Sequence, residues 1–183
     1  EILTGAFSAE YGQAQSGVVN ITTKTGGTKL AGNFDYKTDN GISDFGNSYN
    51  TDYVSFNFGG PVPFLGEKLN FFSSGNLNRT DTWLDNKRYR DQLDWLGIGI
   101  SERQDNTLNL NAKINYDFRD NIKMTFSYND AYKSWSNYNW LWHMSPDNMA
   151  EYGRETKRYN FRINHFLSKS TFYNINIGYM TVN

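Results

Sequence analysis

The chain has 183 residues, enough for one domain, and its 18 basic and 19 acidic residues leave a formal net charge of −1. That balance gives no electrostatic reason to expect a nucleic-acid partner. The sequence contains no Cys, which excludes disulfides, thiolate metal sites and thiol nucleophiles. It also contains no run of about 18 apolar residues, which excludes a spanning helix, whereas barrel strands give a much weaker signal.

The N-terminal region, residues 1–27, is punctuated by glycines. Within it, Val18, Val19 and Ile21 predict a short buried strand, and Gly26-Gly27 loosens the exit into the next segment. The chain opens with Glu-Ile-Leu-Thr, without an initiating Met or the apolar segment of a secretory signal. We therefore expect a piece of a longer protein.

The rest of the chain predicts seven β-strands and no clear helix, because apolar and polar side chains alternate with a period of two. In residues 107–118, for example, Leu108 and Ile114 point to one side and Asn109 and Asn115 to the other. Aromatic residues make up 17% of the chain, as is typical of all-β proteins. The predicted strands are 29–38, 52–59, 68–79, 107–118, 122–133, 157–167 and 171–182.

The connections alternate in length, so that short loops lie at one end of the predicted meander and long loops at the other. The segments 119–121 and 168–170 are tight turns, whereas 80–106 and 134–156 are long. Outer-membrane barrels have short periplasmic turns and long extracellular loops. Several strands also reach the length that a tilted strand needs to cross a bilayer.

The apolar side of these strands must be covered, since each large side chain left in water forfeits about 1.5–3 kcal/mol. Aromatic residues near the strand ends have the positions expected of the aromatic bands at the two membrane–water interfaces of a barrel. They are Tyr116 and Phe118 at the short-turn side and Tyr128, Tyr132, Trp135 and Tyr159 toward the long loops. We therefore expect an antiparallel transmembrane β-barrel; a soluble β-sandwich is the alternative. Seven strands leave open edges, so missing sequence must complete a barrel.

The stretch TGAFSAEYGQAQSGVVNITTKTGG resembles the end of the plug domain of TonB-dependent outer-membrane receptors. The stretch FNFGGPVPFLGEKLNFF resembles an early barrel turn and strand of their Oar-like branch, which often carries a carboxypeptidase-regulatory-like domain ahead of the plug. Gly60-Pro61 is expected to make that turn. Ser16 departs from the family, which commonly has a second Gly there. The matching plug residues, expected to be structural, are Glu10, Tyr11, Gly12, Gly17, Asn20 and Lys24.

The resemblance implies that residues 1–27 end a plug domain and that residues 28–183 begin a 22-stranded barrel in the cell outer membrane. The Asn-rich side of the strands would then face the plug or water. Such receptors import a scarce ligand, such as a peptide, a glycan or a metal chelate, and a TonB-type energy-coupling complex pulls on a segment preceding the plug. The alternatives are a barrel with a structural or partner-binding role and, less favoured, a soluble ligand-binding sandwich.

Ligand contacts are expected on the long loops, where aromatic rings could stack on a sugar, a peptide or a partner lipoprotein. The densest cluster, in residues 134–148, comprises Trp135, Tyr138, Trp140, Trp142 and His143. The alternative is that these rings pack against other loops or rest at the lipid boundary. Residues 84–105, which include Arg103, mix basic and acidic side chains and are expected to form a solvated, locally folded lid rather than a binding patch.

No catalytic reading is supported by the sequence. His143 and His165 lie on different predicted segments without a metal-ligand pattern, and Gly97 and Gly99 lack the helix of a phosphate-binding loop. We therefore expect no enzyme activity, cofactor or metal.

Overall fold

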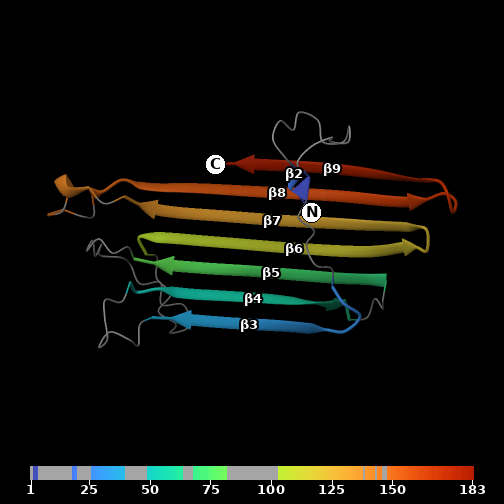
Figure 1. The fold of residues 1–183 in the computed structure, drawn as a ribbon, viewed down its shortest axis with the longest axis horizontal. Coiled ribbons are helices and arrows are strands. Elements are labelled where there is room, and N and C mark those ends of the chain that lie inside the picture. The colour runs from blue at the N-terminus through green and yellow to red at the C-terminus, as the bar shows by residue number, and fades with distance from the viewer. Residues whose placement is uncertain are drawn as a thin grey trace.

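The computed structural model describes residues 2–3, 18–19, 26–39, 49–63, 68–81, 103–137, 139–142, 144–145 and 148–183. These residues form an all-β fold, with a seven-stranded antiparallel sheet and a separate two-stranded pair (Figure 1). The pair joins β1 (Ile2–Leu3) to β2 (Val18–Val19). The large sheet contains β3 (Ala31–Thr38), β4 (Asp52–Pro61), β5 (Leu69–Thr80), β6 (Asp105–Arg119), β7 (Ile122–Ser136), β8 (Glu151–Phe166) and β9 (Phe172–Val182).

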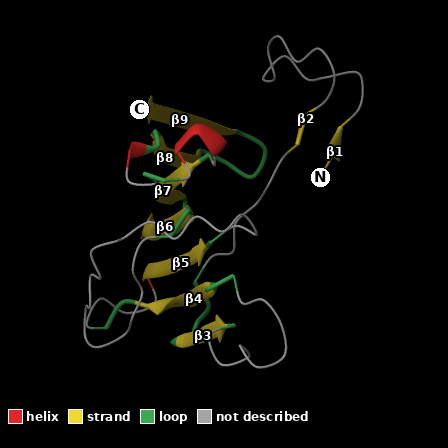
Figure 2. Cartoon of the chain, turned by 90° about the vertical axis from the view of Figure 1, so that its left-hand side faces the viewer, coloured by secondary structure: helices red, strands yellow, loops and turns green. Residues whose placement is uncertain are grey.

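The large sheet is an up-and-down meander, since each strand pairs with the next strand in the sequence. It is open, with β3 and β9 at its two edges. Seen along the strands, the sheet is a single layer with the β1–β2 pair set apart from it (Figure 2). The described residues contain no helix long and apolar enough to cross a membrane; their helical element is η3, the short 3-10 turn Trp140–Trp142.

All seven predicted strands are confirmed, and the differences lie at their ends. β7 continues to Ser136 and β8 begins at Glu151, so the connection is 137–150 rather than the predicted 134–156. The added residues of β8 are rich in charge and lack an apolar alternation, but pairing with β7 extends them as a strand. Gly60-Pro61 was expected to form a turn; both residues instead lie in β4, and Pro61 pairs with Asn70.

The register places the alternating side chains on two faces of different chemistry. Phe34, Phe56, Leu110 and Phe126 lie on one side, which we call the apolar face, and Asn109, Asn111 and Asn129 lie on the polar face. Among the described residues, Met149 is the one buried large apolar side chain. No second large sheet covers the apolar face within these residues, so this part of the chain lacks the core of a β-sandwich.

The short-turn ends of the strands step progressively along the sheet. The row of paired residues that starts at Ala31, the first residue of β3, reaches β9 at Gly178. β9 itself begins at Phe172, six residues nearer the short turns. Over six strand-to-strand steps this is about one residue, or roughly 3.4 Å, for each 4.8 Å of sheet width. If the short turns all lie in one plane, the strands are therefore tilted by about 35° from the normal to that plane.

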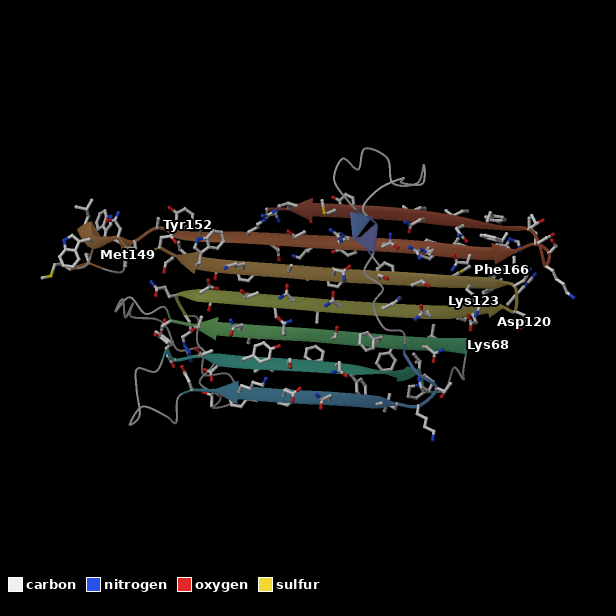
Figure 3. The ribbon with its side chains drawn as sticks, in the orientation of Figure 1. Lys68, Asp120, Lys123, Met149, Tyr152 and Phe166 are labelled. Atoms are coloured by element: carbon white, nitrogen blue, oxygen red, sulfur yellow. The ribbon has the colours of Figure 1, made fainter. Side chains whose placement is uncertain are left out.

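The two ends of the sheet differ as the connection lengths predict. Lys68, Asp120, Lys123 and Phe166 lie at the short-turn end, and Met149 and Tyr152 at the opposite end (Figure 3). At the short-turn end, residues 120–121 and 167–171 link β6 to β7 and β8 to β9. The connections at the other end are longer.

Replacing Gly60 by Ala is expected to destabilise the sheet by about 1–3 kcal/mol. Gly60 has φ 157°, and a Cβ there would lie 2.7 Å from the Leu30 Cα, a backbone atom that cannot turn aside. The matched control is Gly153→Ala in β8, because a Cβ at that position would meet nothing within 4 Å. Denaturant unfolding should separate the two variants, and equal stability would contradict the proposed close approach.

Candidate functional site

The apolar face carries many large, solvent-exposed side chains. Its central row pairs Ile114 with Phe126, Phe126 with Phe161 and Phe161 with Ile177. Ile177 is 62% exposed even though it lies mid-strand. The exposed large side chains of this face within the described strands are Phe34, Tyr36, Phe58, Leu108, Ile114, Tyr116, Phe118, Phe126, Tyr159, Tyr173, Ile175, Ile177 and Tyr179. Large exposed apolar patches are typical of surfaces that contact another protein or a membrane.

Aromatic contacts border this surface at both ends. Tyr159 lies between Tyr128 and Tyr179, with ring centroids 5.0 and 6.3 Å apart, next to the first polar row toward the long loops. Tyr116 and Phe118, with centroids 6.0 Å apart, lie at the short-turn end. Of the aromatic residues that the sequence placed near the strand ends, Tyr116, Phe118, Tyr128, Tyr132 and Tyr159 lie on the apolar face, and Trp135 lies on the polar face opposite Tyr152.

The polar limit of the apolar face runs obliquely to the strands. On β4–β6 the first polar row consists of Asp52, Arg79 and Asn106. On β7–β9 it consists of Asp130, Lys157 and Thr181. The β6 residue in this second row is Leu110, four residues nearer the short turns than Asn106. From β4 to β9, the first polar row and the short-turn ends of the strands therefore both shift toward the short turns. The two borders of the apolar face are thus inclined to the strands in the same direction.

The polar face is a ladder of amides joined across neighbouring strands. Asn109 Nδ2 donates to Asn76 Oδ1 at 3.0 Å, and Asn129 Nδ2 donates to Asn111 Oδ1 at 2.6 Å. Each bond joins residues that are direct partners in the register. Cross-strand pairs of this kind fix the register and leave a hydrophilic surface.

A buried polar cluster lies at the long-loop end of the sheet. Arg103 Nη2 donates to Asp52 Oδ2 at 2.6 Å, and the two side chains are only 3% and 2% exposed. Tyr36 Oη donates to the other Asp52 oxygen at 2.7 Å, and Arg103 Nη1 donates to the Asn50 carbonyl. The expectation that Arg103 belongs to a solvated lid is therefore wrong. Burial of an ionic pair requires such additional hydrogen bonds.

The sequence missed this cluster, although a signal for it exists. Asp52 occupies the same face of β4 as Val54, Phe56 and Phe58, so a carboxylate stands in line with apolar side chains. Such a group needs a charged partner. The partner, Arg103, lies 51 residues away, where no local pattern could find it.

The predicted aromatic cluster is divided. Trp135 lies in β7, not in a loop, and its ring stacks on Tyr152 with centroids 5.8 Å apart. Trp140 and Trp142 lie in η3 and are 69% and 44% exposed. Tyr138 and His143 are outside the described residues, so whether these five residues form one binding site stays a prediction.

The predicted plug motif also lies outside the described residues. This applies to Glu10, Tyr11, Gly12, Gly17, Asn20 and Lys24. Within the same region, Val18–Val19 forms β2 as the sequence predicted, paired with Ile2–Leu3.

His165 is placed by polar neighbours. Its Nδ1 lies 2.8 Å from the Tyr173 hydroxyl, and its Nε2 lies 3.2 Å from the Asn121 amide. No group of three or more His, Asp or Glu that could hold a metal ion occurs in the described part of the chain.

Comparison of the chain with protein-family models, with curated proteins and with solved structures found no match.

Proposed function

We propose that this sheet is part of the wall of a TonB-dependent outer-membrane receptor that imports a scarce ligand through a plugged barrel. In this proposal the apolar face meets lipid, and the polar face looks toward the plug and the lumen. Other strands, outside this chain, close the barrel at the open edges of β3 and β9, since unpaired strand edges are not tolerated in lipid.

The observation that carries the proposal is the uncovered apolar face with its oblique borders. Strands of membrane barrels are tilted by about 35–45°, and the stagger of the short turns corresponds to about 35°. On β6 the apolar side chains run from Leu108 to Phe118. Ten residue steps cover roughly 34 Å of strand, or about 28 Å along the axis at this tilt, close to the roughly 25 Å apolar band of such barrels.

The strand and loop lengths support the same orientation. β6, β7 and β8 contain 15, 15 and 16 residues and extend past the apolar band on the long-loop side. The charged cluster of Asp52 and Arg103 lies at that end, where the wall would leave the lipid. The transport role itself rests on the plug resemblance. A barrel that only binds a partner shares this wall, and a full gene lacking a coupling segment would favour it.

A single-cysteine scan of β7 tests the membrane assignment, after replacement by Ser of any Cys that the rest of the full-length protein contains. Spin labels would be placed at positions 124–128 of the full-length protein in lipid vesicles. We expect high collision rates with oxygen at Met124, Phe126 and Tyr128, because oxygen concentrates in acyl chains. Low rates are expected at Thr125 and Ser127, on the other face.

Two results would contradict the proposal. One is an oxygen profile without a period of two, or with high rates on the polar face. The other is release of the protein from native membranes by alkali in the absence of detergent, since an inserted barrel is held by its whole apolar band.

A further inference from the structure

Three arginines follow the polar face of β8 from the long-loop end toward the short turns. Arg154, Arg158 and Arg162 are four residues apart and all are exposed. They span eight residue steps, or roughly 27 Å of strand. Within the described residues none of them makes an ion pair, and the contact of Arg158 is a 3.7 Å approach of Nη2 to Met180 Sδ.

The carboxylates on the polar face near these arginines are paired with lysines. On the polar face of β6–β9 the described acidic residues are Asp105 and Asp117, which lie 3.1 and 3.8 Å from Lys133 and Lys123. Lys113 lies near enough to Arg162 for their positive charges to repel each other. The three arginines of β8 therefore carry positive charge that no carboxylate on the described polar face of β6–β9 compensates, and an anion would neutralise it.

Asn115 adds a hydrogen-bond donor without an acceptor. It shares a row with Thr125 and Arg162, and its Oδ1 accepts a hydrogen bond from Thr125 Oγ1 at 3.1 Å. That bond turns the amide so that Nδ2 is shielded from solvent and has no hydrogen-bond partner in the described structure. A shielded donor beside two cations needs an acceptor atom.

We propose that the polar face of β6–β8 is a path for a solute bearing oxyanion groups, with Asn115 and Arg162 forming a subsite at its short-turn end. The inference rests on the proposed function, because it takes this face to line the lumen. The arginines extend along the strand and are separated by the neutral side chains of Thr156 and Asn160, so they provide several separate positions for an anion. Transit requires several weak sites of this kind rather than one strong site.

The test is calorimetric titration of the detergent-solubilised full-length protein with citrate and with inorganic phosphate, with sucrose as the neutral control. We expect at least one of the two anions, and not sucrose, to bind, with an affinity that falls as salt rises. The double variant R158Q/R162Q should bind about tenfold or more weakly, because charge-assisted hydrogen bonds are lost. The control is K123Q, which removes one positive charge from the same face but from a residue paired with Asp117.

The variant R158K/R162K separates binding from folding, since it keeps both charges and should bind within about threefold of the unsubstituted protein. Absence of binding by both anions, or equal binding by R158Q/R162Q, would overturn the proposal. So would a fall in melting temperature in R158Q/R162Q without any anion binding by the parent protein, because a fixed acidic segment would then occupy the arginines. If any of these results occurred while the oxygen profile of β7 still had a period of two, the anion path would be rejected and the proposed membrane wall would be retained.

Discussion

Phe126→Lys is expected to lower the free energy of unfolding of the membrane-inserted protein by about 2–4 kcal/mol, the cost of Lys at the middle of a barrel's lipid face. Phe126 lies in the central row of the apolar face, between Ile114 and Phe161, and it is 42% exposed. If lipid covers this position, the ammonium must either enter hydrocarbon or pull the strand out of place. Urea titration of the protein in lipid vesicles measures the change.

The matched control is Ser127→Lys, one residue further along β7 and on the polar face. It introduces the same charge into the same strand and should cost less than about 1 kcal/mol, as most surface substitutions do. Phe126→Leu separates the lost ring from the added charge and should cost less than about 1.5 kcal/mol. Equal losses for the two Lys variants would reject a lipid-facing apolar side.

Asp52→Asn is expected to destabilise the protein by about 3–5 kcal/mol, because it leaves the buried Arg103 charge without its counterion. The guanidinium is 2.6 Å from the carboxylate and almost fully buried, so water cannot replace the lost partner. Tyr36, which donates to the same carboxylate, loses the charged acceptor as well. Chemical unfolding followed by circular dichroism gives the size of the effect.

A double substitution distinguishes the ionic contribution from the general need to fill space. Asp52→Leu with Arg103→Met should recover more than half of the loss, because paired apolar replacements of buried ion pairs are often tolerated. Glu155→Gln is the exposed comparison. Its carboxylate is 2.7 Å from Lys157, but the side chains of Glu155 and Lys157 are 30% and 35% exposed, so we expect a loss of about 0.2–1 kcal/mol. A loss this small for Asp52→Asn would contradict a stabilising role of the buried pair.

The strands and their two faces could be predicted because both depend on local alternation. Successive side chains point to opposite sides of an extended chain, so Leu108, Ile114 and Asn109 assign their own faces without any long-range information. The start of β8 could not be predicted in this way. Glu151–Thr156 carries no apolar alternation, and its strand conformation depends on backbone pairing with β7.

The position of Trp135 shows the limit of reading residues by composition. Its neighbours Trp140 and Trp142 made it look like part of one aromatic loop, but β7 continues through Ser136 and turns the ring toward Tyr152 on the polar face. A side chain beyond the predicted end of a strand is interpreted as a loop residue, whereas inside the strand the alternation of side chains assigns it to a face. Strand ends depend on the partner strand, which a single sequence does not reveal.

By itself, the sequence determined an all-β chain of seven strands with an apolar and a polar side, because the period of two is a property of the backbone. The tertiary structure decided that these strands form one open meander, with stagger, oblique borders and an arginine row on the polar face. It also brought Arg103 to Asp52. These features depend on register and on contacts between residues far apart in the chain, which only the assembled sheet fixes.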